Sequence, residues 1–331
     1  MSSNMQDAVQ NEVRSLPGRL GRFFQRLPVV TYSVAAVSGA VFLVDLVLTI
    51  LMQNHPLARA FGLAPSKVFQ VQLWRLLTYP LVHYGIFHIF FNLMVLLPLS
   101  TTAEKRVGSV QYVYMLGILF TLLPGILYAS VIHIIFQSSE THVASGTSGW
   151  VFALIAWECC RVEGPRSFLG LFQVSSKLFP PVLLVLTELL FPQSSFFGHV
   201  ACMAFGYLYA YGKLDALIPS TEWFNRMQDK APFCWMTTSS RFIDINDAQD
   251  TGSFLPVFFD PITTTTTSTT LGGSQPSAPT ASRQHYVTIA DVEDDLPAYS
   301  PPAGESAGLQ AGSPADKQPL FPGKGQRLDH Q

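Results

Sequence analysis

Six apolar runs dominate the sequence between residues 29 and 211, and each holds at most one carboxylate and no Lys or Arg. A helix of about 20 apolar residues crosses the roughly 30 Å hydrocarbon core of a bilayer and satisfies its own backbone hydrogen bonds there. Only 13% of the side chains are charged, against roughly 25% in globular proteins. We therefore predict an all-α membrane protein with six transmembrane helices, over residues 29–51, 80–100, 110–136, 143–160, 178–191 and 196–211.

Lys and Arg flank these runs unevenly, and short loops that carry positive charge stay in the cytosol. They gather on one side of the predicted spans: Arg14, Arg19, Arg22, Arg26, Lys105, Arg106, Arg161, Arg166, Lys177, Lys213, Arg226 and Lys230. The charged lead before the first run is too long for a secretory signal peptide, so we expect that run to stay in the mature protein. An even number of spans then puts both termini in the cytosol.

Composition divides the chain into three parts: a polar segment 1–27, a six-span domain 28–212 and a cytosolic tail 213–331. After Asp250 the tail is rich in Thr, Ser, Pro, Gly and Ala, which bury too little apolar surface to offset chain entropy. We expect it to be mostly disordered. The first loop, 52–79, is apolar and aromatic although it carries three basic residues, and we expect it to lie in the membrane interface.

The four cysteines, Cys159, Cys160, Cys202 and Cys234, lie in predicted spans or on the cytosolic side, so we predict no disulfide framework. The pair Cys159–Cys160 at the end of a span fits packed free thiols, with palmitoylation as the alternative. The distribution of charge indicates no nucleic-acid site. We also expect no metal site and no cofactor.

A serine and a histidine stand at the start of two of the runs. Ser148 lies in Gly146-Thr147-Ser148-Gly149 at the start of the fourth run, and His199 opens the sixth. Both runs begin on the luminal side, so the two side chains lie at similar depth. A serine hydroxyl becomes a nucleophile when a nearby base accepts its proton, and His199 is the best candidate for that base.

The second run carries His83, His88 and Asn92 from the same side, and the last two share a helix face because they are four residues apart. Donors of this kind stabilise an oxyanion, so we predict that His88, Asn92 and the Ser148 backbone N–H do so here. Glycines at 146 and 149 allow another backbone to approach closely, and Phe152, one turn beyond Ser148, is placed to pack under the His199 ring.

Each of these residues also fits a structural role when it is taken alone. Serine among small residues is common in helix packing, and Asn92 fits a hydrogen bond between helices. His83 or His88 fits a histidine bonded to a backbone carbonyl, although histidine within a span favours function. The joint arrangement favours a catalytic site.

The ordered elements resemble the signature of rhomboid intramembrane serine proteases, over roughly residues 28–211. The elements are His88-Ile-Phe-Phe-Asn92, Gly146-Thr147-Ser148-Gly149, Gly198-His199, Trp74-Arg75 in the first loop, and Glu104 with Gly108 after the second run. The detail around Ser148 and His199 is most similar to the small six-span rhomboids of the fungal Golgi.

The resemblance implies that Ser148 is the nucleophile, that His199 is the general base and then acid, and that His88 and Asn92 line the oxyanion hole. It implies a dyad without a carboxylate, and no Asp or Glu in the runs is evidently placed to assist it. We expect Asp45 to be a packing or interface residue.

Glu188 has no evident role, and two positions depart from the family pattern. Cys202 stands where the family usually has glycine, while Gly206 keeps the next glycine, so we expect a close but looser approach of the fourth and sixth helices. Thr147 replaces the commoner alanine.

The implied reaction is hydrolysis of a peptide bond in or near the luminal end of a substrate transmembrane helix, with water reaching the site from the lumen. The fungal branch further implies Golgi residence, with the endoplasmic reticulum as the alternative, and membrane-tethered transcription-factor precursors among the substrates. The alternative function is a catalytically silent adaptor that delivers membrane clients to an ATPase. A transporter is disfavoured because the runs lack paired charges.

The tail carries a second pattern at residues 321–328, which resembles the SHP box that binds AAA ATPases of the valosin-containing-protein class. Phe321, Gly323, Gly325 and Leu328 match its fixed positions, with a chance match in a Gly-Pro-rich tail as the alternative. Residues 296–299, Leu-Pro-Ala-Tyr, more weakly resemble a ligand of WW-domain ubiquitin ligases.

Overall fold

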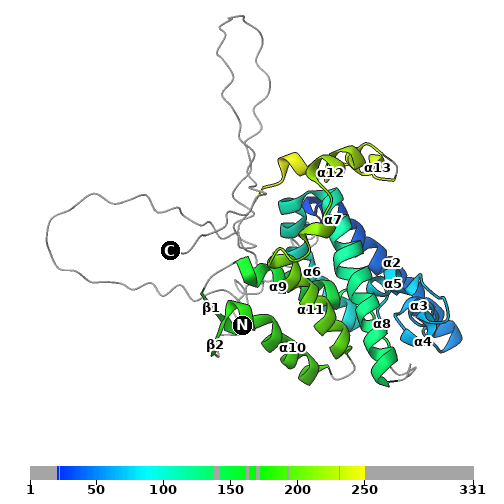
Figure 1. The fold of residues 1–331 in the computed structure, drawn as a ribbon. Coiled ribbons are helices and arrows are strands. Elements are labelled where there is room, and N and C mark those ends of the chain that lie inside the picture. The colour runs from blue at the N-terminus through cyan, green and yellow to red at the C-terminus, as the bar shows by residue number, and fades with distance from the viewer. Residues whose placement is uncertain are drawn as a thin grey trace, which may run out of the picture. The chain divides into compact units, whose positions relative to one another are not determined.

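The computed structural model describes residues 21, 23–136, 142–161, 164–168, 172–191, 194–230 and 232–249. Helices make up nearly all of their regular structure, with one two-stranded hairpin (Figure 1). The segment 1–20 and the tail from residue 250 lie outside the described residues, so the SHP-like box at 321–328 and the 296–299 pattern remain sequence predictions.

Each of the six apolar runs forms helix. The first two give α2 (Val29–Met52) and α6 (Ile86–Val107), and the third gives α7 (Ser109–Tyr114), the π-helix η2 (Met115–Leu122) and α8 (Leu123–Phe136). The others give α9 (Ser148–Arg161), α10 (Phe179–Leu190) and α11 (Phe196–Ala210). Among the described residues, three helical segments are long and apolar enough to cross a membrane: Val29–Met52, Ile86–Val107 and Ser109–Phe136.

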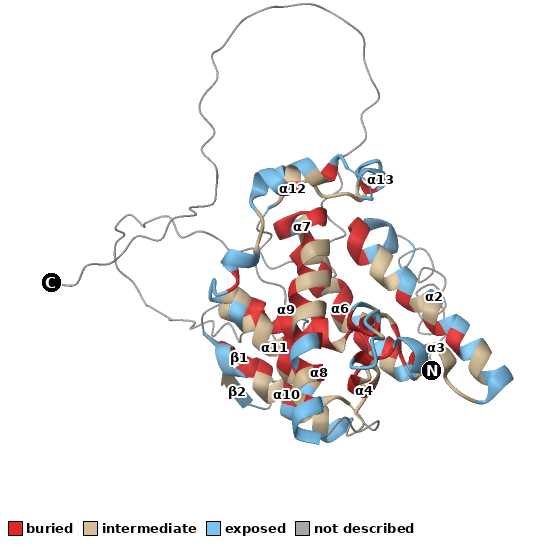
Figure 2. Ribbon diagram, turned by 45° about the vertical axis from the view of Figure 1, so that its right-hand side comes forward, coloured by how far each residue is buried: buried red, intermediate tan, exposed pale blue. Residues whose placement is uncertain are grey.

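Helix α9 lies at the centre of the bundle, and its residues from Gly149 to Cys159 are buried on every side (Figure 2). A helix that is apolar all round requires neighbours all round, and α6, α10 and above all α11 supply them. A Cβ atom on Gly206 of α11 would lie 2.2 Å from the carbonyl oxygen of Ala153. The serine and histidine helices therefore touch backbone to backbone.

Cys202 does not hold these helices apart. A Cβ atom on Gly149 would lie 2.7 Å from the Cys202 Sγ atom, so the thiol occupies the space that glycine leaves. The same Sγ lies 3.9 Å from both the Tyr79 hydroxyl and the Phe120 carbonyl oxygen. The close approach of α9 and α11 is thus maintained with the larger residue in place.

The first loop folds into short helices, α3 (Pro56–Phe61), α4 (Pro65–Val68), α5 (Arg75–Thr78) and the 3-10 turn η1 (Tyr79–Leu81). Arg75 fastens the loop, because its Nη1 donates to the carbonyls of Arg59 at 2.7 Å and Gly62 at 2.6 Å. The Trp74 indole donates to the Ala60 carbonyl at 3.1 Å.

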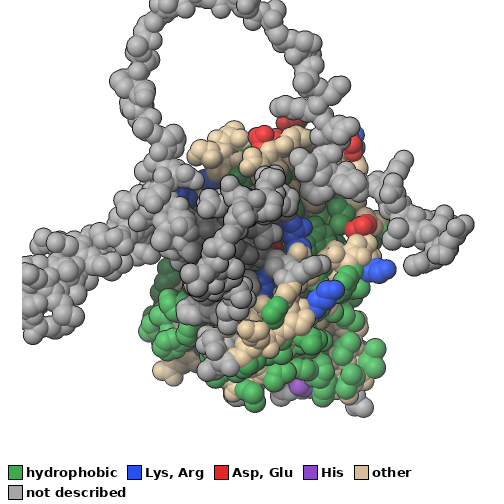
Figure 3. Space-filling model, turned by 90° about the vertical axis from the view of Figure 1, so that its left-hand side faces the viewer, with side chains coloured by type: hydrophobic (Ala, Val, Ile, Leu, Met, Phe, Trp, Pro, Cys, Tyr) green, Lys and Arg blue, Asp and Glu red, His purple; other side chains and the backbone are tan. Residues whose placement is uncertain are grey.

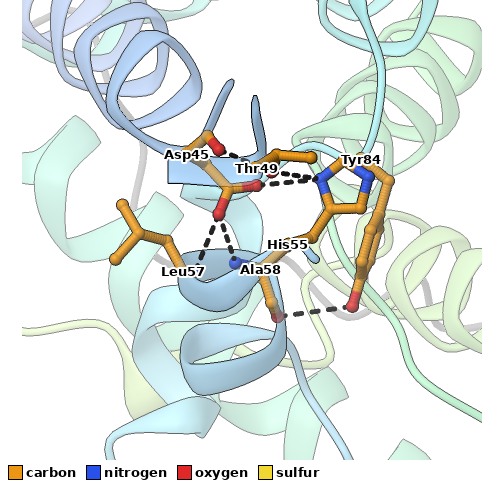
Figure 4. Close-up of polar contacts among 6 residues, drawn as sticks. All are labelled: Asp45, Thr49, His55, Leu57, Ala58 and Tyr84. Carbon is orange, nitrogen blue, oxygen red and sulfur yellow. Dashed lines mark hydrogen bonds and ion pairs between the residues drawn. The ribbon is translucent and has the colours of Figure 1, made fainter. Parts of the chain in front are cut away.

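Asp45 ties this loop to α2 (Figure 4). Its Oδ1 accepts from the backbone N–H of Leu57 at 2.7 Å and of Ala58 at 3.4 Å, at the start of α3. Its Oδ2 lies 3.2 Å from His55 Nδ1, and the Tyr84 hydroxyl donates to the Ala58 carbonyl at 3.3 Å. A buried carboxylate is thus paired with donors that would otherwise lack partners.

Glu104 performs a similar task at the other end of α2. Its carboxylate accepts from the backbone N–H groups of Val30 at 2.9 Å and Thr31 at 2.8 Å, and from the Ser109 hydroxyl at 2.7 Å. Carboxylates are favourable at a helix N-terminus, where N–H groups lack intrahelical partners. Gly108 follows with φ +84°, and a Cβ atom there would lie 2.8 Å from the Ile245 Cα.

A buried ion pair joins α6 to α9, since Arg106 Nη1 lies 2.8 Å from Glu158 Oε2 and each side chain is 5% exposed. The Arg106 guanidinium also lies over the Trp157 ring, 5.2 Å from its centroid. The sequence indicated a cytosolic cation at position 106 but not its buried partner.

The packed structure continues beyond the boundary predicted at residue 212. After α11 come η4 (Asp215–Leu217), α12 (Thr221–Gln228), α13 (Cys234–Thr237) and η5 (Ile245–Asp247). The Arg241 carbonyl accepts from Val29 N at 3.0 Å, and the Ile243 carbonyl accepts from Ser109 N at 2.9 Å. The change of composition near Tyr211 therefore marks the end of the last apolar helix and not the end of the folded part.

The remaining link, between α9 and α10, contains the hairpin of β1 (Pro165–Phe168) and β2 (Phe172–Ser175), followed by η3 (Ser176–Leu178). The strands are antiparallel, with Pro165 opposite Ser175. In Figure 3, hydrophobic side chains dominate the lower part of the visible face, and the visible charged side chains lie higher, toward the end that carries α12.

Candidate active site

Helix α9 begins at Ser148 because the residues before it are held in a non-helical path. Ala144 forms an isolated bridge with Leu63, and Gly146 N donates to the Tyr79 carbonyl at 2.9 Å. Gly146 has φ +90°, a conformation that residues with a Cβ atom rarely adopt. The first loop thereby fixes where the helix starts and where its first hydroxyl lies.

The Ser148 Oγ lies 2.8 Å from His199 Nε2, within hydrogen-bond reach. The two side chains stand 51 positions apart in the sequence and come from adjacent helices, α9 and α11. The Phe152 ring packs against the imidazole with 4.7 Å between centroids and 40° between planes. His199 is 5% exposed, so its ring is held by both packing and hydrogen bonding.

His88 and Asn92 face the same loop from α6. A Cβ atom on Gly146 would lie 2.8 Å from the His88 ring and 3.2 Å from the Asn92 amide nitrogen. That nitrogen is buried, and within the described part of the chain it has no hydrogen-bond partner. Leaving a buried donor without a partner costs about 1–3 kcal/mol of folding free energy. A group that enters the site and accepts from this nitrogen would recover that free energy.

His83 has a supporting position. Its Nε2 accepts from the Thr147 backbone N–H at 3.3 Å, and its ring meets the His88 ring edge-on at 5.0 Å between centroids. This histidine therefore bonds to a backbone N–H and not to a backbone carbonyl, and it helps to hold the loop that leads to Ser148.

A small cavity opens beside the serine and histidine. It is lined mainly by small residues and aromatic rings: Leu63, Tyr79, Pro124, Tyr128, Ala144, Ser145, Gly146, Ser148, Gly149, Ser195, Gly198, His199 and Cys202. Gly206 lies two turns further along α11, against Ala153, and so belongs to the contact between the helices.

The π-helical segment η2 also contacts this region, and no pattern in the sequence predicted that contact. The Trp150 indole donates to the Thr121 hydroxyl at 2.7 Å, and the Tyr79 hydroxyl donates to the Thr121 carbonyl at 3.3 Å. A π-helix changes the i to i−4 bonding of the backbone, so that its carbonyls are available to side chains. Residues of η2 thereby hold the start of α9 and the end of the first loop.

Glu188 corrects one expectation. We expected no carboxylate near the pair, yet Glu188 Oε1 lies 3.0 Å from His199 Nδ1. The Glu188 side chain is 18% exposed and the His199 side chain 7% exposed. The available signal was an ionisable residue inside an apolar run, which is unusual enough to suggest a function. The run alone does not show which side chain that residue contacts.

The four predicted partner-binding residues, Phe321, Gly323, Gly325 and Leu328, lie outside the described residues, and so does the 296–299 pattern. Among the described residues no cluster of His, Cys, Asp or Glu could hold a metal ion.

Comparison with known proteins identifies relatives of this chain. A family profile described as the rhomboid domain matches residues 70–216. "Rhomboid-type serine protease B" of Aspergillus fumigatus is 31% identical over 206 residues, which are 61% of this chain and 73% of that protein. "Rhomboid-type serine protease 2" of Neurospora crassa is 31% identical over 164 residues, 49% of this chain and 58% of that protein. "Rhomboid-like protein 15" of Arabidopsis thaliana is 28% identical over 238 residues, 67% of this chain and 55% of that protein.

The apolar helices and these similarities define an integral membrane protein. The chain belongs to the rhomboid family, as the signature in its sequence predicted. It spans little more than half the length of the Arabidopsis and Neurospora relatives.

Proposed function

We propose that this protein is an intramembrane serine protease that hydrolyses peptide bonds in or near the luminal end of substrate transmembrane helices. The observation that carries the proposal is the 2.8 Å contact between Ser148 Oγ and His199 Nε2. The Asn92 amide nitrogen, which has no hydrogen-bond partner among the described residues, lies close to the same loop. A nucleophile, a base and an oxyanion donor are the minimum set for acyl transfer by serine.

The reaction uses these groups in order. Ser148 Oγ attacks the carbonyl carbon of the scissile bond while its proton passes to His199 Nε2. The Asn92 amide, His88 and the Ser148 backbone N–H stabilise the oxyanion. His199 then gives the proton to the leaving nitrogen as the C–N bond breaks. Water, deprotonated by His199, hydrolyses the acyl-enzyme and restores the serine.

The small residues around the cavity support a substrate preference. A helical substrate hides its carbonyls in hydrogen bonds and must unwind before attack, which favours small or helix-breaking residues near the cut. The cavity walls include Ala144, Gly146, Gly149 and Gly198, whose small size allows a substrate backbone to approach closely. Membrane-tethered transcription-factor precursors are the substrates that we propose, on the resemblance to fungal relatives.

The proposed topology has six transmembrane helices with both termini in the cytosol, in the membrane of the Golgi or the endoplasmic reticulum. Helices α9, α10 and α11 have 14, 12 and 15 residues, or about 21, 18 and 22 Å at 1.5 Å per residue. They are shorter than the roughly 30 Å hydrocarbon core, so a helix of this group begins or ends within it. If α9 begins within the core, Ser148, its first residue, lies below the luminal surface of the membrane. Water then reaches Ser148 from the luminal side only.

The tail carries the proposed partner site. Residues 321–328 would bind an AAA ATPase of the valosin-containing-protein class, with Phe321 and Leu328 as apolar anchors. The 296–299 pattern would bind a WW-domain ubiquitin ligase. Deletion of residues 321–328 should abolish co-purification of the ATPase and leave peptidase activity unchanged, whereas retained co-purification would contradict the assignment.

Co-expression with a transmembrane substrate tests the enzymatic proposal. We expect the wild-type protein to produce a cleaved fragment and Ser148→Ala to produce none while still reaching the membrane. Equal cleavage by both proteins would refute the proposal. A client that binds both proteins and is cut by neither would support the silent adaptor instead.

A further inference from the structure

Glu188 and His199 form a histidine–carboxylate pair at the proposed catalytic site. They come from the consecutive helices α10 and α11, with 3.0 Å between Glu188 Oε1 and His199 Nδ1. The other ring nitrogen, Nε2, lies 2.8 Å from Ser148 Oγ. The carboxylate, imidazole and hydroxyl are therefore connected in one line of hydrogen bonds.

We infer that Glu188 is a positioning residue for the proposed serine protease, so that the site works as a Ser148–His199–Glu188 triad and not as a dyad. The inference rests on the proposed function. It extends that function because the carboxylate acts through the imidazole without touching the substrate.

The chemistry of imidazole explains what the carboxylate does. Neutral histidine carries one N–H, and a carboxylate at Nδ1 keeps the proton on that nitrogen. The Nε2 lone pair then faces the Ser148 hydroxyl and can accept its proton. When the proton arrives, the imidazolium gains a charge-assisted hydrogen bond to Glu188, which stabilises the charge that develops during attack.

The described residues contain a second histidine–carboxylate pair, Asp45–His55, which has a structural role and serves as a comparison. In Asp45–His55 the carboxylate also accepts from the backbone N–H groups of Leu57 and Ala58, so its main task is to cap α3 (Figure 4). His55 Nδ1 is shared with the Thr49 hydroxyl at 3.1 Å. Glu188 instead binds a histidine whose other nitrogen meets the candidate nucleophile.

Glu188 also links α10 to α11, so the test must separate a tether from a positioning role. The titratable groups of the described residues that face His199 are Glu188 on α10 and His88 on α6. Cys202 on α11, Tyr79 on η1 and Tyr128 on α8 line the same cavity. Glu188→Gln preserves size and one acceptor oxygen but removes the charge. Glu188→Asp preserves the charge on a shorter side chain.

The experiment compares wild type, Glu188→Gln, Glu188→Asp, Asp45→Asn and Ser148→Ala as full chains in liposomes. The probes are a fluorogenic single-span peptide and a serine-directed fluorophosphonate, each measured over a range of pH. We expect Glu188→Gln to lower kcat and the labelling rate about 10- to 100-fold with KM unchanged, as for loss of one charge-assisted hydrogen bond. The acid limb of its pH profile should move to lower pH, because the imidazolium loses its carboxylate.

Glu188→Asp should recover part of the rate and of the pH profile. Asp45→Asn should lower thermal stability without moving that profile. A Glu188→Gln protein with wild-type rates and pH profile would overturn the inference and leave the proposed function intact. So would a Glu188→Gln protein with reduced stability and an unmoved pH profile, because that result describes a tether. Wild type without Ser148-dependent labelling would overturn both proposals.

Discussion

The contact at Gly206 predicts a large effect from one methyl group. A Cβ atom there would lie 2.2 Å from the Ala153 carbonyl oxygen and 2.8 Å from the Ala153 Cα, both backbone atoms that cannot rotate away. Ordinary van der Waals contact starts at 3.4 Å, so Gly206→Ala must move α9 and α11 apart by about 1.2 Å, the difference between the two distances.

That displacement reaches the candidate site. His199 precedes Gly206 by seven residues, or about 10 Å along the helix. A rigid shift would lengthen the 2.8 Å contact between Ser148 Oγ and His199 Nε2 to as much as about 4 Å, beyond hydrogen-bond reach. A misplacement of about 1 Å typically lowers a rate about 100-fold, so we expect at least that loss.

The assay is fluorophosphonate labelling and peptide cleavage in liposomes, with Gly39→Ala as the control. Gly39 lies on α2 and has no atom within 4 Å of the added Cβ position, so its substitution should leave both rates unchanged. A Gly206→Ala protein with wild-type rates would refute the argument that this glycine sets the distance between the serine and histidine helices.

Three other substitutions test individual side chains. Asn92→Ala should lower kcat about 100- to 1,000-fold with little change in KM, because it removes an oxyanion donor, and an unchanged kcat in steady-state assays would contradict that role. Glu158→Ala should lower the free energy of unfolding by about 3–5 kcal/mol, measured in detergent, because Arg106 loses its buried carboxylate. A loss under 1 kcal/mol would contradict it. Glu104→Ala should lower that free energy by about 2–6 kcal/mol, because the carboxylate serves two backbone N–H groups of α2 and each unpaired donor costs about 1–3 kcal/mol. Unchanged thermal unfolding would speak against it.

The helical segments were predictable because apolar runs have a direct physical meaning. Each run from residue 29 to residue 211 forms helix in the structure, and the family assignment from the ordered motifs is confirmed. Of these segments three meet the length and composition of a span, so the six-span count stays a prediction. Helices that begin on the same side also explain why Ser148 and His199 could be paired before any contact was known.

Contacts that depend on the relative placement of two helices could not be predicted in this way. Glu188 meets His199 only because α10 and α11 pack in a particular register, and the buried pair of Arg106 with Glu158 depends on α6 and α9 in the same manner. An apolar run predicts that a helix exists. It does not predict the axial position or the rotation of that helix relative to its neighbour.

The folded segment after residue 212 was missed for another reason. It is less apolar than the six runs, yet the carbonyls of Arg241 and Ile243 accept hydrogen bonds from Val29 and Ser109. Composition indicates how much apolar surface a segment can bury on its own. Composition does not predict the hydrogen bonds that the segment makes with helix ends elsewhere in the chain.

Labelling by a fluorophosphonate is the most direct measurement of the central claim, that Ser148 is a nucleophile activated by His199. Wild-type protein, Ser148→Ala and His199→Ala would be purified as full chains, placed in liposomes and labelled under identical conditions. We predict labelling of the wild type alone, mapped to Ser148 by mass spectrometry. Equal labelling of the His199→Ala protein, or no labelling of the folded wild type, would contradict the claim.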